Sequence, residues 1–477
     1  MQTAVENQHD HAGRSLALGS AGLALFWVVF IWGFWDKGPL ALGINTNVFL
    51  LLALGLLANI FPKHQPLRAK KNLVWLIPCL LISVSFSIFD NPFIKMASIP
   101  VWPLALLVFT ADALLINRSQ KWGTSMLGLF IMRALAVLAS LFTAGRTYLA
   151  LLMGTSREQT ARRVAVGLAL LLAIAFAIII PLLSAADPVF AATLKPIYEQ
   201  VLKIIDAAAV ERIIAFILFS LFFLAILLAW RQTPGQPKEE PKIGVDNIVA
   251  GITIGGVLAL YLVFLALQLN RLWVNELPID FKATESLVKS GFWQLFTLSI
   301  INGLIFLAIF GKTNKTVRRL LAAFTAASLL LVVSAAWRVG LYDAYYGLSY
   351  EKFFASYTVL YSLILFGYLL AKFFTVRSGN TIKTLALLFL WMFALASIAP
   401  IEQFILRANL KLAERPGSRV KLYEMTMLSG DVLGSVMDKK DEARFADWGD
   451  WIEARKKEIN DKNWYELSAM NIVYKLK

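Results

Sequence analysis

The segment "LLAAFTAASLLLVVSAAWRVGLY", Leu320–Tyr342, decides the fold class of this chain. From Leu320 to Trp337 no residue is charged, and nearly every side chain is small or apolar. A helix of about 20 such residues crosses the roughly 30 Å hydrocarbon core of a bilayer. The basic segment "KTNKTVRR", Lys312–Arg319, precedes this run, and the polar segment "DAYYGLSYEK" follows it. The pattern therefore predicts a transmembrane helix that starts beside cations and ends among tyrosines and acids.

The same pattern recurs along the 477-residue chain, which is 58% hydrophobic and only 16% charged, with a mean hydropathy of +0.66. These values exceed those of ordinary soluble domains. We therefore expect an all-α fold, a polytopic transmembrane helical bundle with a small C-terminal helical domain. The eleven expected spans are 16–35, 44–61, 72–89, 96–116, 164–184, 209–230, 248–268, 292–311, 320–342, 353–374 and 384–400.

A twelfth apolar segment, Met126–Gly145, contains Arg133 and lies between two basic loops. A cation inside a span is unfavourable, so we interpret this segment as an interfacial or re-entrant helix on the cytoplasmic side. If it crossed the bilayer, the later basic loops would all face outward, which the positive-inside rule disfavours. Whether Met126–Gly145 crosses the bilayer therefore decides which side of the membrane the C-terminus occupies.

The net charge of +15 is unevenly distributed along the chain. With a cytoplasmic N-terminus and eleven spans, the basic loops face the cytoplasm, as the positive-inside rule requires. The tail then lies outside an inner (plasma) membrane. These loops include Lys63, Arg68, Lys70, Lys71, Arg157, Arg162, Arg163, Lys312, Lys315, Arg318 and Arg319. The basic charge thus indicates contact with anionic lipid headgroups and predicts no nucleic-acid partner.

Changes in composition divide the chain into four parts: an N-terminal transmembrane half (1–230), a cytoplasmic linker (231–247), a C-terminal transmembrane half (248–400) and an extramembrane helical tail (401–477). The linker contains "RQTPGQPKEEPK", which is rich in proline and charge. In the tail, the spacing of Phe445, Trp448, Trp451, Ile452 and Ile459 predicts an amphipathic helix, and 420–437 also has helical spacing. Because the tail has so few apolar positions, we expect it to need support from the membrane domain or a partner to be stable.

Residue types exclude several kinds of catalytic site. The only cysteine, Cys79, lies in an apolar span, and the three histidines, His9, His11 and His64, lie in polar sequence. An intramolecular disulfide, a thiolate metal cluster and a histidine-based intramembrane site are therefore excluded. Glu276, Asp280 and Glu285 are close in sequence, but spacing alone does not show convergent oxygen ligands. We expect no metal and no cofactor.

Polar residues at the membrane edge are the remaining candidates for function, because a charge there is unfavourable unless it is paired. The candidate cluster is Arg338, Tyr342, Asp343 and Tyr346, with Asp187 in "LLSAADPVF". Most of these residues also have structural explanations. Tyrosines suit the interface, and Asp187 before Pro188 suits a turn or helix cap. Tyr342 lies one helical turn beyond Arg338.

The segment that follows this cluster has the residues of a helix–turn–helix connection. Gly347 can end one helix in a positive-φ conformation, Ser349 can cap the next helix, and Glu351 in its first turn suits the helix dipole. Arg338 is therefore the residue with no structural explanation, and Tyr342 and Asp343 are its expected partners.

Three motifs together resemble a group of bacterial inner-membrane proteins known as a domain of unknown function. They are "LLSAADPVF" at 182–190, "GFWQL" at 291–295 and "SAAWRVGLYDAYYGLSYEKF" at 334–353, and 405–437 is similar to the post-membrane region of that group. The resemblance covers roughly residues 165–440. Ser349 replaces the usual threonine, and Lys352 replaces an arginine, which removes bidentate anion binding there. The resemblance implies an architecture and no known reaction.

Three functions remain open. The sequence favours a non-catalytic sensor, scaffold or assembly component, whose tail meets an envelope or membrane protein. The second is a transporter of a small solute or lipid, which Pro100, Pro103 and Pro181 in spans support. The third is an envelope-modifying enzyme at the outer face, with Asp187, Asp343 or Glu351 as base and Arg338 holding an anionic headgroup.

Overall fold

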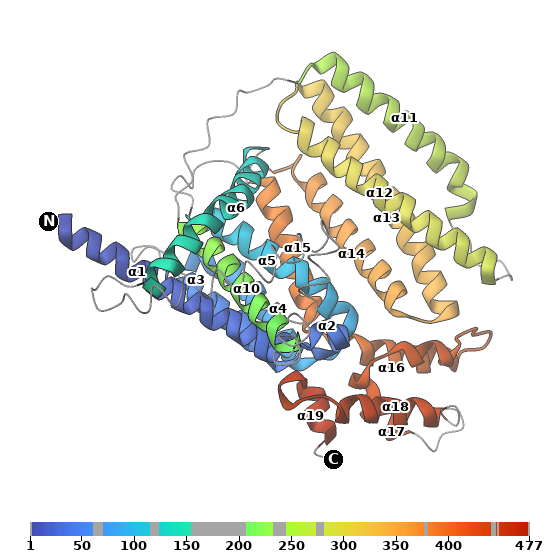
Figure 1. Cartoon of the computed structure of the whole chain (residues 1–477). Coiled ribbons are helices and arrows are strands. Elements are labelled where there is room, and N and C mark those ends of the chain that lie inside the picture. Colours follow the sequence, from blue (N-terminus) through green and yellow to red (C-terminus); the bar gives the residue numbers. More distant parts are fainter. Residues whose placement is uncertain are drawn as a thin grey trace, which may run out of the picture. The chain divides into compact units, whose positions relative to one another are not determined.

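A computed structural model gives the structure of the chain (Figure 1) and describes residues 2–60, 70–114, 124–153, 207–231, 245–272, 281–375, 380–439, 445 and 448–475. These residues form helices and no strands. They divide into two compact units. The first unit comprises 1–72, 107–116 and 127–236, and the second comprises 73–106, 117–126 and 237–477. The predicted boundary at 231–247 stays a prediction, because most of that linker lies outside the described residues.

The first unit contains α1 (Gln2–Phe26), α3 (Ile44–Ala58), α6 (Thr124–Met153) and α10 (Ala207–Arg231). Leu16 and Ala17 of α1 pack against α10 in a buried apolar cluster. The hydroxyl of Tyr148 donates to the carbonyl of Ala17 at 2.9 Å and to that of Ser220 at 3.3 Å, so it joins α6 to both helices. Before α3, the chain forms α2 (Phe34–Lys37) and a short 3₁₀ turn (Gly38–Ala41), and the direction of this segment differs from that of α3 by 92°.

The transmembrane part of the second unit combines α4 (Lys70–Ile88, from residue 73) and most of α5 (Pro92–Leu114) with five later helices. These are α11 (Asn247–Leu272), α12 (Phe281–Ile309), α13 (Lys315–Tyr346), α14 (Tyr350–Ala371) and α15 (Thr381–Ser397). One apolar core joins α11 to α14. Within it, the Tyr261 hydroxyl donates to Asn302 Oδ1 at 2.7 Å, and Asn302 Nδ2 donates to Ser328 Oγ at 3.0 Å. Such bonds fix helix neighbours where lipid offers no hydrogen-bonding partner.

A proline in α4 explains how α15 packs against it. Pro78 has no N–H, so the carbonyl of Val74, four residues earlier, loses its helical donor. The indole Nε1 of Trp391 in α15 donates to this carbonyl at 3.0 Å. In addition, Trp102 of α5 donates to the carbonyl of Cys79 at 3.1 Å. Backbone groups near the proline are thus paired by tryptophans from neighbouring helices.

After a bend of 70°, the tail begins with α16 (Ile401–Ala413). Short 3₁₀ turns follow at Leu422–Met427 (η5) and Gly430–Val432 (η6), then α17 (Leu433–Met437), α18 (Gly449–Asn460), the 3₁₀ turn η8 (Trp464–Glu466) and α19 (Ala469–Lys475). The prediction of a helix over 420–437 is therefore wrong for most of that segment. The five apolar residues expected on one helical face, Phe445, Trp448, Trp451, Ile452 and Ile459, are all buried in the tail core.

The core of the tail continues into the ends of the membrane helices. Ile94 of α5 and Ala396 of α15 belong to this core, and Tyr350, Phe353 and Phe354 of α14 pack against it. The tail thus has the support from the membrane domain that its small apolar content predicted.

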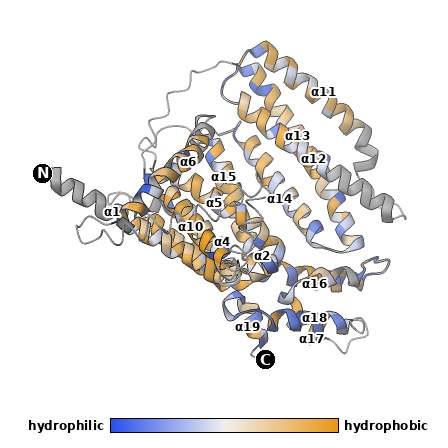
Figure 2. Ribbon diagram, viewed as in Figure 1, coloured by the Kyte–Doolittle hydropathy of each residue, from blue (hydrophilic) through white to orange (hydrophobic). Residues whose placement is uncertain are grey.

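The described helices confirm the predicted fold class of a polytopic helical membrane protein. Seven of them are long and apolar enough to cross a bilayer, or nine if each of two bent pairs counts as one span. Figure 2 shows hydrophobic residues along these helices and many hydrophilic residues in the tail. All predicted spans except 164–184, which lies outside the described residues, fall on helices, with ends shifted by several residues.

The doubtful segment Met126–Gly145 belongs to α6, in which Ile131–Leu151 is apolar and long enough to span. The guanidinium of Arg133 donates to the carbonyls of Ala229 and Trp230 at 3.1 Å each, near the C-terminal end of α10. Arg133 is therefore paired with unsatisfied carbonyls. The second arginine of this helix, Arg146, lies 4.9 Å from the ring centre of Phe142. Because Arg133 is paired, it no longer argues against a span, so the alternative count of twelve stays open.

Candidate functional site

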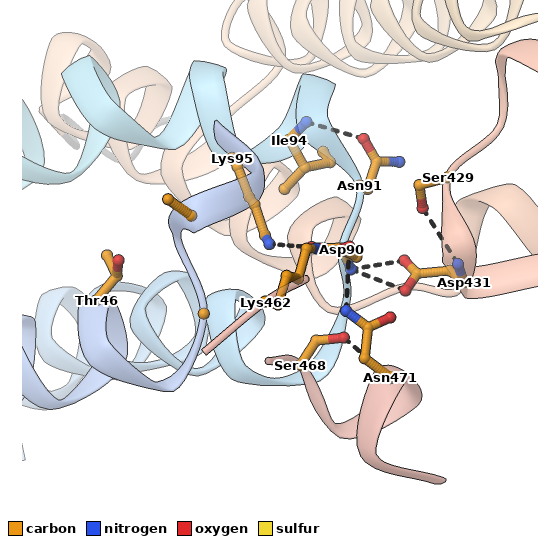
Figure 3. A network of polar contacts seen from close by, with 12 residues as sticks. Thr46, Asp90, Asn91, Ile94, Lys95, Ser429, Asp431, Lys462, Ser468 and Asn471 are labelled. Carbon is orange, nitrogen blue, oxygen red and sulfur yellow. Dashed lines mark hydrogen bonds and ion pairs between the residues drawn. The ribbon is translucent and has the colours of Figure 1, made fainter. Parts of the chain in front are cut away.

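A buried ionic cluster lies where the α4–α5 turn meets the tail, all within the second unit (Figure 3). The carboxylate of Asp90 lies at its centre and is completely inaccessible to solvent. Its Oδ1 accepts from the ammonium of Lys95 at 2.5 Å, and its Oδ2 forms a short contact with the ammonium of Lys462. The side-chain amide of Asn471 donates to the same Oδ2 at 3.1 Å. Residues hundreds of positions apart thus pair at one point.

Two further carboxylates extend this cluster toward the membrane helices. The backbone N–H of Asp90 donates to both carboxylate oxygens of Asp431, at 2.9 and 2.7 Å. The hydroxyl of Tyr350, the first residue of α14, forms a short hydrogen bond to Glu402 Oε1. Glu402 Oε2 accepts from both the backbone N–H and the hydroxyl of Ser429, at 2.8 Å each. A continuous polar chain therefore runs from Lys95 to Tyr350.

Local capping interactions place the side chains of the cluster. Asn91 caps α5 through its Oδ1, which accepts from the N–H of Phe93 at 3.0 Å and of Ile94 at 3.1 Å. This cap fixes the direction of the neighbouring Asp90. In the tail, Ser429 accepts from the N–H of Asp431 at 3.2 Å. A capping box between Asn463 and Glu466 begins the short helix η8 directly after Lys462.

The three carboxyl groups differ in their protonation. Burial by itself would raise the pKa of Asp90, but the ammonium groups of Lys95 and Lys462 outweigh burial, and the pKa of Asp90 lies below its usual value. Burial raises the pKa of Glu402 to about 7, despite the hydrogen bonds from Tyr350 and Ser429. Burial and the neighbouring charges of Glu402 and Asp90 hold the pKa of Asp431 well above its usual value. The cluster thus combines one firmly ionised acid with two that hold protons readily.

A small pocket opens beside these two acids. It encloses about 250 Å³ of space, part of it open to the surroundings, and Glu402 and Asp431 contribute to its wall. Asn91, Ser397 and Gln403 supply further polar lining, and Phe89, Ile94 and Ile401 supply apolar lining. Its enclosed part has room for about one water molecule. The pocket therefore suits water or a proton better than a larger ligand.

Comparison with known proteins gives one match. The family described as a domain of unknown function, DUF4153, matches residues 76–437 of this chain. The chain belongs to the DUF4153 family. No curated protein and no solved structure matches it.

The match confirms the expected resemblance to a family of unknown function, although it begins earlier than residue 165. It includes the α4–α5 turn and ends in α17, so Asp90, Lys95, Glu402 and Asp431 lie inside the region typical of DUF4153. Lys462 and Asn471 lie beyond it. The cluster therefore joins the DUF4153 region to the C-terminal end of this chain.

Four of the predicted site residues lie toward the C-terminal end of α13. Arg338, Tyr342, Asp343 and Tyr346 all lie on this helix, which ends at Tyr346. Asp187 lies outside the described residues. The role of these residues as a functional site stays a prediction.

Side chains of α14 contact both Asp343 and Tyr342. The hydroxyl of Ser356 donates to Asp343 Oδ2 at 2.6 Å. The ammonium of Lys352 lies 5.0 Å from the ring centre of Tyr342 and donates to the carbonyl of Tyr346 at 3.3 Å. The predicted residues thus hold the end of α13 against α14.

The turn after α13 has the predicted conformation. Gly347 ends the helix with φ +73°, Ser349 accepts from the N–H of Lys352 at 3.4 Å, and Glu351 lies in the first turn of α14. The tail adds a clamp to this turn. The side-chain amide of Asn409 accepts from the N–H of Leu348 at 2.6 Å and donates to its carbonyl at 2.8 Å.

The buried ionic cluster was not predicted from the sequence. Asp90 lies between two predicted spans in "FDNPFIK", and Lys95 is a cation near the start of an apolar helix. A charged residue at such a position requires a partner, and this signal could have identified Lys95. Glu402, Asp431 and Lys462 resemble ordinary surface charges in the sequence, because nothing local indicates their burial. Their pairing depends on the tertiary fold of the tail.

Proposed function

We propose that this membrane protein acts as a non-catalytic sensor or scaffold, in which the tail is docked on the ends of the transmembrane helices. The single observation that carries the proposal is the burial of Asp90 against Lys462 and Asn471 of the tail. Removing such charges from water costs several kcal/mol per ion, so a buried pair favours one arrangement over looser alternatives. The arrangement suits a domain that transmits its state to the membrane helices.

The proposed partners are membrane lipids and an envelope or membrane protein that contacts the tail. Exposed apolar side chains on the tail support this proposal. Met427 is 74% exposed and Trp464 is 70% exposed, whereas Phe445, Trp448 and Trp451 are buried. Exposed methionine and tryptophan are common at protein interfaces.

The proposed location is an inner membrane, with the tail on the outer side. At the end of the bundle nearest the tail, the connections 89–91, 347–349 and 398–400 contain no lysine or arginine. The opposite ends of α13, α14 and α15 carry Lys312, Lys315, Arg318, Arg319, Lys372 and Lys383. The positive-inside rule then puts the basic end in the cytoplasm.

Truncation of the chain tests the proposed role. In cells that lack this protein, the full chain should restore whatever envelope phenotype the deletion causes, whereas a chain ending at Pro400 should not. Protein levels in the membrane fraction must be matched for this comparison. If the truncated chain restores the phenotype, the transmembrane part acts alone and the tail is not the functional element.

Substitutions on the tail surface provide a second test that leaves the fold intact. Met427→Asp and Trp464→Asp introduce charge at exposed positions, so docking of the tail should be unchanged. If the tail binds a partner through this surface, at least one variant should lose function at normal membrane levels. The matched control is Lys457→Asp, at an exposed position of α18. Full function in both variants would contradict a partner at this surface.

A further inference from the structure

The buried cluster contains more negative than positive groups. Asp90, Asp431 and Glu402 are at most 4% exposed, and the buried cations of the cluster are the ammonium groups of Lys95 and Lys462, both paired with Asp90. If all five groups were ionised, one negative charge would remain buried without a counterion. The nearby acid Glu458 lies at the rim, 2.5 Å from the guanidinium of Arg455 and 3.8 Å from the ammonium of Lys462. Glu458 and Arg455 add one negative and one positive charge, so they leave the balance of the cluster unchanged. An uncompensated buried charge is strongly destabilising.

The cluster also has fewer hydrogen-bond donors than acceptors. Among the described residues, the side-chain oxygen of Asn471 is buried and has no hydrogen-bond donor. It lies beside Gly430, where a Cβ would be 3.5 Å from this oxygen, and Gly430 precedes Asp431. Buried acceptors normally have a donor. One added proton would bring both a further donor and the missing positive charge to the cluster.

We infer that Glu402 and Asp431 together form a proton-binding site, and that loss of its proton loosens the docking of the tail. The inference rests on the proposed docking function. The step is simple: a carboxylate takes one proton from water and becomes a neutral carboxylic acid, which leaves the cluster with equal positive and negative charge. The proton belongs to the pair, because two interacting acids titrate together.

The pocket supplies the path for this proton. Both acids contribute to its wall, and it has room for about one water molecule. A water there can exchange protons between the cluster and the surroundings. The burial that isolates the cluster therefore does not prevent its titration.

Charged and titratable groups reach the pair from every element packed around it. They are Tyr350 of α14, Asp90 of the α4–α5 turn, Lys95 of α5, Lys462 after α18, and the rim pair Arg455 and Glu458 of α18. Asp90 is held ionised by the two lysines, so its contribution to stability is present at neutral pH and is lost only in strong acid. Near neutral pH, the pair Glu402–Asp431 therefore dominates the response.

The direction of the pH effect follows from the raised pKa values. An acid whose pKa is higher in the docked state stabilises that state below its undocked pKa, and this contribution is lost as the pH rises through the docked pKa. For Glu402, the pKa rises from 4.5 to about 7. Docking should therefore weaken as the pH rises, by about tenfold between pH 6 and pH 8 for one linked proton.

Hydrogen exchange of the full chain in lipid nanodiscs tests this inference. Backbone amides of α16 and α18 are compared between the wild type and Glu402→Gln at pH 6 and at pH 8. The ratio of the two rates cancels the intrinsic pH dependence of exchange. The wild type should exchange about tenfold faster relative to the variant at pH 8 than at pH 6. A ratio that is constant, or that changes in the opposite direction, would overturn the inference.

Two further measurements protect the test against a variant that fails to fold. Asp431→Asn should remove the pH response in the same way, and Glu453→Gln, at an exposed position of α18, should keep it. In the wild type itself, the infrared band of protonated carboxyl groups should weaken as the pH rises from 6 to 8. Absence of this band at pH 6 would contradict the inference. A pH response in a protein whose tail proves dispensable would instead contradict only the proposed function.

Discussion

At the scale of single residues, Asp90 is the centre on which the cluster depends. Replacing it by asparagine removes the shared counterion of Lys95 and Lys462, both of which are nearly inaccessible to solvent. Removing one partner of a buried ion pair typically destabilises a protein by about 3–5 kcal/mol. We expect Asp90→Asn to lower the stability of the tail by this amount, measured by chemical unfolding and tryptophan fluorescence.

A double-mutant cycle separates this effect from a general loss of packing. Lys462→Met removes one of the two cations, so Asp90→Asn and Lys462→Met together should destabilise less than the sum of the single changes. Lys457→Met, at an exposed position of the same region, provides the control and should change stability little. Additive effects of Asp90→Asn and Lys462→Met would show that the two side chains do not interact.

The residues of this cluster mark the limit of sequence analysis. Patterns of hydropathy identify Arg338 as unusual, because it is a charge at the end of an apolar run. The same reasoning assigns Glu402 and Asp431 to a charged tail, where acids are ordinary. Their burial arises from contacts between segments that are distant in sequence, and no local pattern encodes such contacts.

At the scale of elements, the turn between α13 and α14 combines a local signal with a tertiary contact. Gly347 has φ +73°, and a Cβ there would lie 2.7 Å from Asn409 Oδ1 and 2.9 Å from Val420. An alanine would therefore be strained and would displace the clamp on Leu348. We expect Gly347→Ala to destabilise the tail by about 1–3 kcal/mol, the usual range for such strain. Thermal unfolding in detergent measures this loss.

Gly340 of the same helix is the matched control. It lies in the interior of α13, and a Cβ there would meet no atom within 4 Å. Gly340→Ala should therefore be neutral or stabilise the helix by up to about 1 kcal/mol. Equal losses from both substitutions would show that the turn has no special requirement for glycine.

Two segments show where local sequence rules predict the backbone conformation and where they do not. The turn residues Gly347, Ser349 and Glu351 act as predicted, because caps depend on neighbours in sequence. The apolar spacing in 420–437 predicted a helix, but the segment forms short 3₁₀ turns and one short α-helix. Ser429 and Asp431 bond there to Glu402 and Asp90, and these tertiary bonds replace helical ones. Helical periodicity was therefore not sufficient to predict the backbone conformation of 420–437.

At the scale of the whole molecule, the side of the membrane on which the tail lies does not depend on counting the earlier spans. The turn at Gly347 and the basic segment Lys312–Arg319 lie at opposite ends of α13, a helix of 32 residues. If α13 crosses the bilayer, these two ends lie on opposite sides. The tail contacts the Gly347 end through Asn409, so it lies opposite Lys312 whether or not α6 spans.

Cysteine labelling can determine this orientation. We expect Asp450→Cys, at an exposed position of the tail, to react with a membrane-impermeant maleimide in intact spheroplasts. Lys312→Cys should react only after the membrane is permeabilised, because its basic segment faces the cytoplasm under the positive-inside rule. The native Cys79 is buried and should react slowly in both states. The reverse pattern would place the tail in the cytoplasm, and labelling of both positions in intact spheroplasts would show that α13 does not cross the membrane.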